Sequence, residues 1–231
     1  MDSDSPSPTR PPTRDLSDLV VPHRPAGISY EQGEDFDAEA LLTANGYSLE
    51  TQELIALLGS DLAIFQAAAA RTLGAKGEQS AIQNLSRLAM NKAFEETARA
   101  QAAYALARLG VPDGIVLLVQ LIQLNPEGTP APLQAACALA RLGDPVGFPV
   151  VSRALDSPSS LTAMIACKQL YAFAEHEGCP LPGNETVKVY EAFRRTLNRP
   201  EKNIVGEAMA QLSGIGTEEA RRLLSGAPES S

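Results

Sequence analysis

The 231-residue sequence contains no tryptophan, and aromatic residues make up only 5% of it. A β-sheet protein normally draws on aromatic and β-branched side chains, whereas this chain is rich in alanine and leucine, which favour helices. No stretch approaches the roughly 18 consecutive apolar residues of a membrane-spanning helix, and the Asp-, Ser- and Pro-rich start lacks the apolar core of a secretion signal. We therefore expect an all-α protein of the cytoplasm with no membrane partner.

Histidine and cysteine are also scarce, with two and three residues respectively. His176 and Cys179 form a His-x-x-Cys spacing, with Cys167 on the preceding helix, but a structural zinc site takes four ligands and no second tight pair exists. Cys137 and Cys167 each follow an alanine in a helix and are expected to fill the core as small apolar residues. We expect no metal and no cofactor.

The net charge of −9 is unevenly distributed. Residues 1–60 carry 11 acidic and 3 basic side chains, whereas residues 61–231 carry 17 acidic and 16 basic ones. A domain that binds nucleic acid through its phosphates normally has a clear basic excess. The near-neutral remainder of the chain therefore argues against a nucleic-acid partner.

The most informative feature that the sequence does contain is an internal repeat. The segment Gln101–Gly110 reads QAAYALARLG, and Gln134–Gly143 reads QAACALARLG, 33 residues later. A looser copy spans Phe65–Gly74. Repeats of this length are typical of stacked helical units, in which each unit buries its apolar face on its neighbours.

The apolar periodicity and its punctuation predict a half-repeat from Ser48 followed by five helical pairs. Glycines mark the expected ends of first helices, at Gly74, Gly110, Gly143 and Gly216, and prolines open second helices at Pro112 and Pro145. The predicted pairs are 62–73 with 78–91, 95–109 with 113–124, 131–142 with 146–155, 159–175 with 185–197, and 201–213 with 217–225. A Gly- and Pro-rich insertion at 175–185 predicts a longer loop that is either a surface insertion or a functional site.

These Ala-Leu-Ala-Arg-Leu-Gly turns, and the run Leu54–Asp61 before the Ala-rich helix, resemble HEAT repeats, most closely the short bacterial type of phycobilin lyases. The resemblance implies a right-handed α-solenoid over residues 48–225. It leaves 1–47 as an acidic leader, mostly disordered except for a short helix at its end, and 226–231 as a disordered tail. It also implies that Arg99 pairs with an Asp of the preceding turn.

No nucleophile with a matched base and no phosphate-binding glycine loop is present in the sequence. A single His-Glu pair, His176-Glu177, excludes the di-iron site of HEAT-type hydroxylases, which several such pairs hold. The sequence favours a non-enzymatic protein-interaction or scaffolding module. The alternative is a phycobilin-lyase-like subunit that binds a tetrapyrrole or its acceptor protein.

A 33-residue register, with Ile82, Ile115 and Phe148 as the first core residues of successive second helices, predicts the candidate binding surface. It places a row of side chains on the concave face of the solenoid: Arg87, Gln120, Arg153, Arg194 and Arg195. Ordinary solvated positions remain the competing interpretation. If the row acts together, it would bind a protein partner through an acidic segment.

Overall fold

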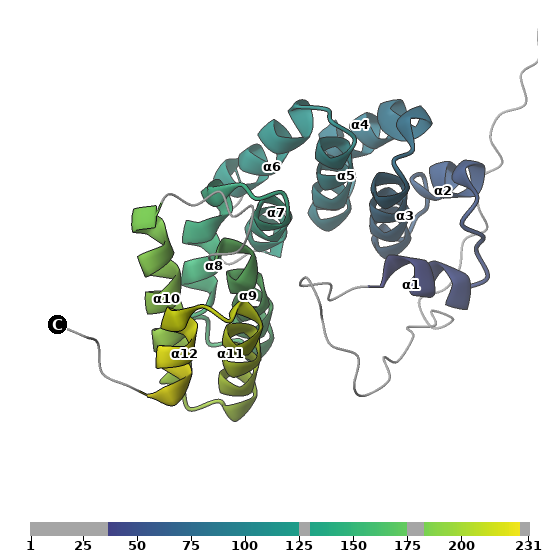
Figure 1. The fold of residues 1–231 in the computed structure, drawn as a ribbon. Coiled ribbons are helices and arrows are strands. Elements are labelled where there is room, and N and C mark those ends of the chain that lie inside the picture. Colours follow the sequence, from purple (N-terminus) through teal and green to yellow (C-terminus); the bar gives the residue numbers. More distant parts are fainter. Residues whose placement is uncertain (1–36, 125–129, 175–182, 227–231) are drawn as a thin grey trace, which may run out of the picture. The chain divides into compact units, whose positions relative to one another are not determined.

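The computed structural model describes residues 37–124, 130–174 and 183–226, and every regular element in these ranges is a helix (Figure 1). The prediction of an all-α solenoid is confirmed. The chain divides into two compact units, whose boundary falls between Gln120 and Leu121. None of the helices in the described ranges is long and apolar enough to cross a membrane.

In the first unit, α3 packs against α1, α2 and α5, and α5 packs against α4. The unit contains α1 (Ala38–Ala44), α2 (Thr51–Leu57), α3 (Ala63–Lys76), the short 3-10 helix η2 (Gln79–Ala81), α4 (Ile82–Met90), α5 (Glu96–Arg108) and most of α6 (Asp113–Leu124).

In the second unit, α9 packs against α7, α8, α10 and α11, and α12 covers α11. The unit contains α7 (Pro130–Arg141), the 3-10 helix η3 (Pro145–Gly147), α8 (Phe148–Ala154), α9 (Ser160–Phe173), α10 (Gly183–Leu197), α11 (Lys202–Ile215) and α12 (Glu218–Ser225).

The helix α1 lies within residues 1–47, the segment assigned from the sequence to the leader, as the short helix anticipated at its end. Leu41 and Leu42 are fully buried, and α1 packs on α3. The Asp37 side chain caps the helix by accepting a 2.9 Å hydrogen bond from the Ala40 amide. The packing of the first unit therefore extends upstream of the proposed boundary at Ser48, at least to α1.

Glycine ends three of the first helices as the sequence predicts, at Gly110, Gly143 and Gly216. Gly110 and Gly143 have φ values of 80° and 74°, and the residue after each donates to a carbonyl five residues back, Val111 to Leu106 and Asp144 to Leu139. This is the Schellman arrangement. The same expectation for Gly74 is wrong, because α3 continues to Lys76 and ends at Gly77.

Gly74 instead allows two helix backbones to approach closely. A Cβ built on it would lie 2.8 Å from the Cα and Cβ of Ala105 in α5. At the start of α6, a Cβ on Gly114 would lie 2.5 Å from the Ala103 carbonyl oxygen, and Gly147 has the same relation to Ala136 at 2.6 Å. Packing between helices therefore requires glycine at these positions, and Gly114 and Gly147 are 33 residues apart, as the repeat demands.

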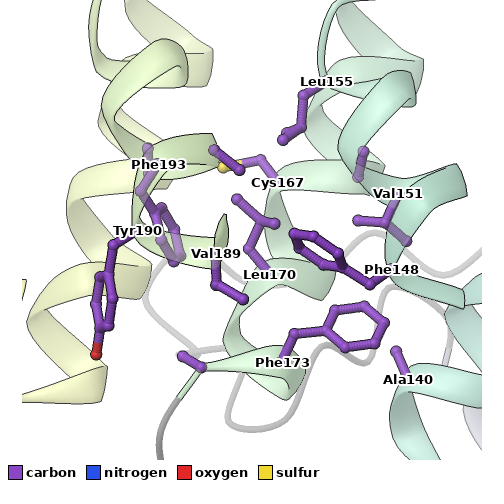
Figure 2. Packing of buried hydrophobic residues seen from close by; sticks show 14 of the residues in the cluster. Ala140, Phe148, Val151, Leu155, Cys167, Leu170, Phe173, Val189, Tyr190 and Phe193 are labelled. Carbon is purple, nitrogen blue, oxygen red and sulfur yellow. The ribbon is translucent and has the colours of Figure 1, made fainter. Parts of the chain in front are cut away.

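The core of the second unit is built around phenylalanine. Phe148 of α8 and Phe173 of α9 pack edge to face with ring centroids 5.4 Å apart (Figure 2), and Phe193 of α10 is fully buried in the same cluster. Cys137 and Cys167 are both buried members of this cluster, so the prediction that they fill the core is confirmed.

Arg99 takes a different partner from the one that the family resemblance implies. Its Nε donates a 3.1 Å hydrogen bond to the carbonyl oxygen of Ala89, near the end of α4. The last carbonyls of a helix lack partners within the helix, so a side-chain donor there satisfies one of them. Arg99 thus joins the start of α5 to the end of α4.

Candidate functional site

A groove in the second unit runs along α8 and α10, the second helices of two successive pairs. It consists of two adjoining hollows of about 520 and 530 Å³ that share Phe148, Ser152 and Lys188. The first hollow is also lined by Pro145, Val146, Pro149 and Arg153, and the second by Glu191, Arg194 and Arg195. We call this surface the α8–α10 groove.

The end of the groove near η3 is apolar. Phe148 forms its floor and is held from behind by the ring of Phe173. Val146 is 49% exposed at its edge, and Pro149 is exposed one turn further along. Two prolines and a packed aromatic ring lose little conformational freedom on binding, so this surface is ready to receive an apolar side chain.

The rest of the groove is basic. Four cationic side chains line it, Arg153, Lys188, Arg194 and Arg195, against the single carboxylate of Glu191. Arg153 belongs to α8 and the other three to α10, so the positive charge comes from both walls. Such a groove favours a ligand that carries negative charge.

Arg195 bridges the two walls. Its guanidinium donates 2.9 Å to the Asp156 carboxylate and 3.0 Å to the Ser152 hydroxyl, both contributed by the α8 side. Arg194 lies 3.9 Å from Glu219 of α12. The Arg195 and Asp156 side chains are about half exposed, and ion pairs of this kind contribute only about 0–1 kcal/mol. A carboxylate of a ligand can therefore exchange with Asp156 at low cost.

Arg199 joins the end of α8 to the start of α11. Its guanidinium donates to the carbonyl oxygens of Leu155 and Ser157, which follow α8, and makes a 2.6 Å salt bridge with Glu201 at the start of α11. The hydrogen bond from Arg199 lowers the pKa of Glu201, and the same bond raises the pKa of Arg199. The contact ties the residues after α8, one of the two helices that line the groove, to the linker between α10 and α11.

The groove brings together three of the five residues predicted to form the binding row, Arg153, Arg194 and Arg195. The other two belong to the first unit, where Arg87 lies exposed on α4 and Gln120 exposed on α6. The row as a continuous surface through both units stays a prediction.

One assumption behind that row is wrong. Ile115 is 37% exposed and is not a core residue of α6. The buried residues that repeat at 33 positions are Leu85, Leu118 and Val151, each fully buried. Because they keep the same period, Arg87, Gln120 and Arg153 still occupy equivalent exposed positions on their helices.

Sequence reasoning missed Lys188, Glu191 and Ser152. Lys188, Glu191 and Arg195 stand at i, i+3 and i+7 on α10, a spacing that puts side chains on one helical face. Because these side chains differ in charge, the sequence showed no basic stripe on α10. Ser152 is one of many polar residues, and nothing in the sequence distinguishes it from the others. A helical-face analysis of α10 would have found the first two.

Among the described residues, no three His, Cys, Asp or Glu side chains gather closely enough to hold a metal ion. His176 and Cys179, and with them most of the predicted loop at 175–185, lie outside the described residues. Burial raises the pKa of the Cys167 thiol to about 12, with a smaller contribution from Glu207. That thiol stays protonated near neutral pH and is a poor nucleophile.

The comparison with protein families supports part of the resemblance seen in the sequence. A family model for HEAT repeats matches residues 51–130, from α2 to the first residue of α7. No curated protein matches the chain. The helical repeats over this span are therefore similar to HEAT repeats, and the narrower likeness to phycobilin lyases rests on the sequence motifs alone.

Proposed function

We propose that this protein is an interaction module that binds an acidic, partly apolar segment of another protein in the α8–α10 groove. The observation that carries the proposal is the combination of the Phe148 floor with basic side chains on both walls. HEAT repeats commonly serve as protein-interaction scaffolds, which supports the same general role over residues 51–130.

The two ends of the groove would divide the work of recognition. An apolar side chain of the partner would cover Phe148, Val146 and Pro149 and supply burial of apolar area. Carboxylates further along would pair with Arg153, Lys188 or Arg195. Because exposed charge pairs are individually weak, several of them in register are needed for useful affinity, and binding should weaken as salt is raised.

The proposal is tested by selecting random peptides displayed on phage against the full-length protein. We expect the selected peptides to combine acidic residues with at least one large apolar residue. Binding of a selected peptide, measured by fluorescence anisotropy, should fall at least tenfold in the double variant Arg153→Glu/Lys188→Glu, because each substitution replaces attraction by repulsion.

Lys202→Glu/Arg221→Glu is the matched control, because it reverses two exposed charges of the same unit, on α11 and α12, outside the groove. It should leave binding within about twofold. Selected peptides without an acidic excess, or equal binding by the groove variant and the control, would exclude the α8–α10 groove as the site. Circular dichroism of each variant separates lost binding from lost folding.

The alternative from the sequence, binding of a tetrapyrrole, has only the motif resemblance behind it. Adding biliverdin to the purified protein tests it directly. A shifted absorption band of biliverdin that stays with the protein through gel filtration would favour the alternative. An unchanged biliverdin spectrum would exclude tetrapyrrole binding and leave protein binding as the proposed role.

A further inference from the structure

The first 36 residues contain a segment whose composition matches the α8–α10 groove. Residues 15–22 read Asp-Leu-Ser-Asp-Leu-Val-Val-Pro and include Leu19, Val20 and Val21, the one run of three large apolar residues within residues 1–36. Asp15 and Asp18 bracket Leu16 in the same stretch. Acidic and large apolar side chains therefore occur together there within eight residues.

The groove presents the complementary pattern within a similar length. Its apolar end has Phe148 as a floor and Val146 at an edge that is 49% exposed. Its basic end begins within about one helical turn, where Arg153 and Lys188 face the same hollow. An apolar residue on the floor would thus bring a neighbouring carboxylate next to these two cations.

We infer that residues 15–22 bind in the α8–α10 groove of the same chain and compete there with the outside partner. This inference rests on the proposed function, since it concerns the same groove. It specifies the occupant as an internal acidic segment that regulates access to the site.

The covalent connection favours this occupant over a free peptide of equal intrinsic affinity. Fourteen residues separate Pro22 from Asp37, where the described structure begins, and such a connection reaches at most about 50 Å when fully extended. A connection of this kind gives an effective concentration on the order of 1 mM when its length suits the distance. At that effective concentration, an internal contact that is too weak to matter between separate molecules would occupy a large share of the groove, and a nitroxide label at position 17 tests whether the connection spans the distance.

The charge balance of the segment points the same way. Residues 1–36 carry seven acidic and three basic side chains, whereas the side chains lining the groove include four cations and one carboxylate. Arg14 directly precedes Asp15, whereas the apolar run separates Asp18 from Arg24. Asp18 is therefore the carboxylate best placed to pair with the groove, and Asp15 adds a second negative charge three residues away.

The inference is tested by paramagnetic relaxation enhancement in the full-length chain. Ser17→Cys carries a nitroxide label, Cys179→Ser removes a competing thiol, and the buried Cys137 and Cys167 remain. Amide signals on both groove walls, including Ser152 and Lys188, should lose most of their intensity. A label at Ser3→Cys is the control and should broaden them much less.

Two further results would overturn the inference. One is attenuation that appears only when labelled and isotopically enriched chains are mixed, because the contact would then be between molecules. The other is no attenuation of α8 and α10 signals by the label at position 17, since the segment would then bind elsewhere or not at all. In either case the proposed function is tested separately. If binding of a selected peptide is still weakened by Arg153→Glu/Lys188→Glu, the groove remains the partner site and only the inference about residues 15–22 fails.

A binding measurement gives the functional consequence. Asp15→Asn/Asp18→Asn should tighten the affinity of the full-length protein for the selected acidic peptide by about two- to tenfold, the factor expected when an internal competitor fills half to nine-tenths of the site. Asp2→Asn/Asp4→Asn removes the same charge outside the segment and should change the affinity less than half as much. Equal effects of the two pairs would show a general charge effect and overturn the inference.

Discussion

The contact between α3 and α5 in the first unit and the contact between α8 and α9 in the second are filled in different ways. In the first, both helices carry fully buried alanines, such as Ala69 in α3 and Ala102 in α5, and Gly74 lies directly against Ala105. In the second, Phe148 and Phe173 meet edge to face (Figure 2). The distance between packed helices depends on the side chains between them.

This difference predicts opposite weaknesses. Helices that meet through glycine and alanine have no side chain that can rearrange, so added atoms must displace backbone. A core filled by rings loses a large volume of contacts when one ring is removed. The first unit should therefore be sensitive to larger residues and the second to smaller ones. Phe148 itself belongs both to the core of the second unit and to the floor of the α8–α10 groove.

The largest effect is expected from removing a ring in the second unit. Phe173→Ala should lower the free energy of unfolding by about 3–5 kcal/mol, because the side chain is almost fully buried and its removal leaves a cavity. Hydrogen exchange measured by mass spectrometry should show lost protection in α7–α10 and little change in α3–α5. Leu161→Ala, on the exposed face of α9, should cost less than about 0.5 kcal/mol. Equal loss of protection in both units would contradict the comparison.

The next prediction compares two arginines of the second unit, the more buried Arg199 and the exposed Arg195. Arg199→Met should destabilise by about 1.5–3 kcal/mol, because it removes charge-assisted hydrogen bonds to the Leu155 and Ser157 carbonyls and to Glu201. Arg195→Met should cost only about 0–1 kcal/mol, since its partner Asp156 is exposed. Chemical denaturation monitored by circular dichroism measures the free energy of unfolding of both variants. Similar losses would show that the difference in burial between Arg199 and Arg195 does not affect their contributions to stability.

The Arg199 contact also has a defined pH dependence. The folded pKa of Glu201 is lowered from its ordinary value of 4.5, mainly by the hydrogen bond from Arg199. Its contribution to stability is therefore present above pH 4.5 and is lost as the pH falls through the lowered folded value. In Arg199→Met the acid-side decline should be shallower than in the parent protein, and an unchanged pH profile would exclude this linkage.

A third change tests the first unit by adding one methyl group. Gly74→Ala should destabilise by about 1–3 kcal/mol, because the new Cβ would lie 2.8 Å from Ala105 atoms. Gly206→Ala adds the same methyl to α11, where nothing lies within 4 Å, and should stabilise by about 0.5–1 kcal/mol. Thermal denaturation of the two variants measures both changes. A Gly74→Ala protein as stable as the parent would mean that α3 and α5 can move apart to accommodate the added methyl group.

The last effect concerns the Cys167 thiol and is absent near neutral pH, because it appears only under alkaline conditions. Burial raises its pKa from 9.0 to about 12, so the folded state opposes formation of the thiolate. The stabilisation is complete below pH 9 and is lost as the pH rises toward 12, by about 2 kcal/mol at pH 10.5. Cys167→Ala should remove that part of the decline between pH 8.5 and 10.5. A slope unchanged by the substitution would show that other groups cause the alkaline loss.

The sequence was sufficient to predict the helical pairs because their signals are local. Alanine and leucine favour helix, Gly110 and Gly143 accept the left-handed conformation at helix ends, and Pro145 begins a helix without needing an amide proton. The same local logic failed at Gly74, whose role is set by Ala105 in another helix. It also failed at Ile115, because an apolar residue gives no local sign of whether a neighbour covers it.

Composition and the 33-residue repeat therefore determined the fold class, the approximate extent of the helices and the exposed positions of Arg87, Gln120 and Arg153. Only the tertiary structure decided that Arg153 and Lys188 share a hollow with Phe148, that Arg195 crosses to Asp156, and that Arg199 holds the end of α8. Helices form through hydrogen bonds between residues four positions apart, whereas these contacts join residues about 35 to 45 positions apart. Such pairings depend on how complete helices pack, which no local pattern records.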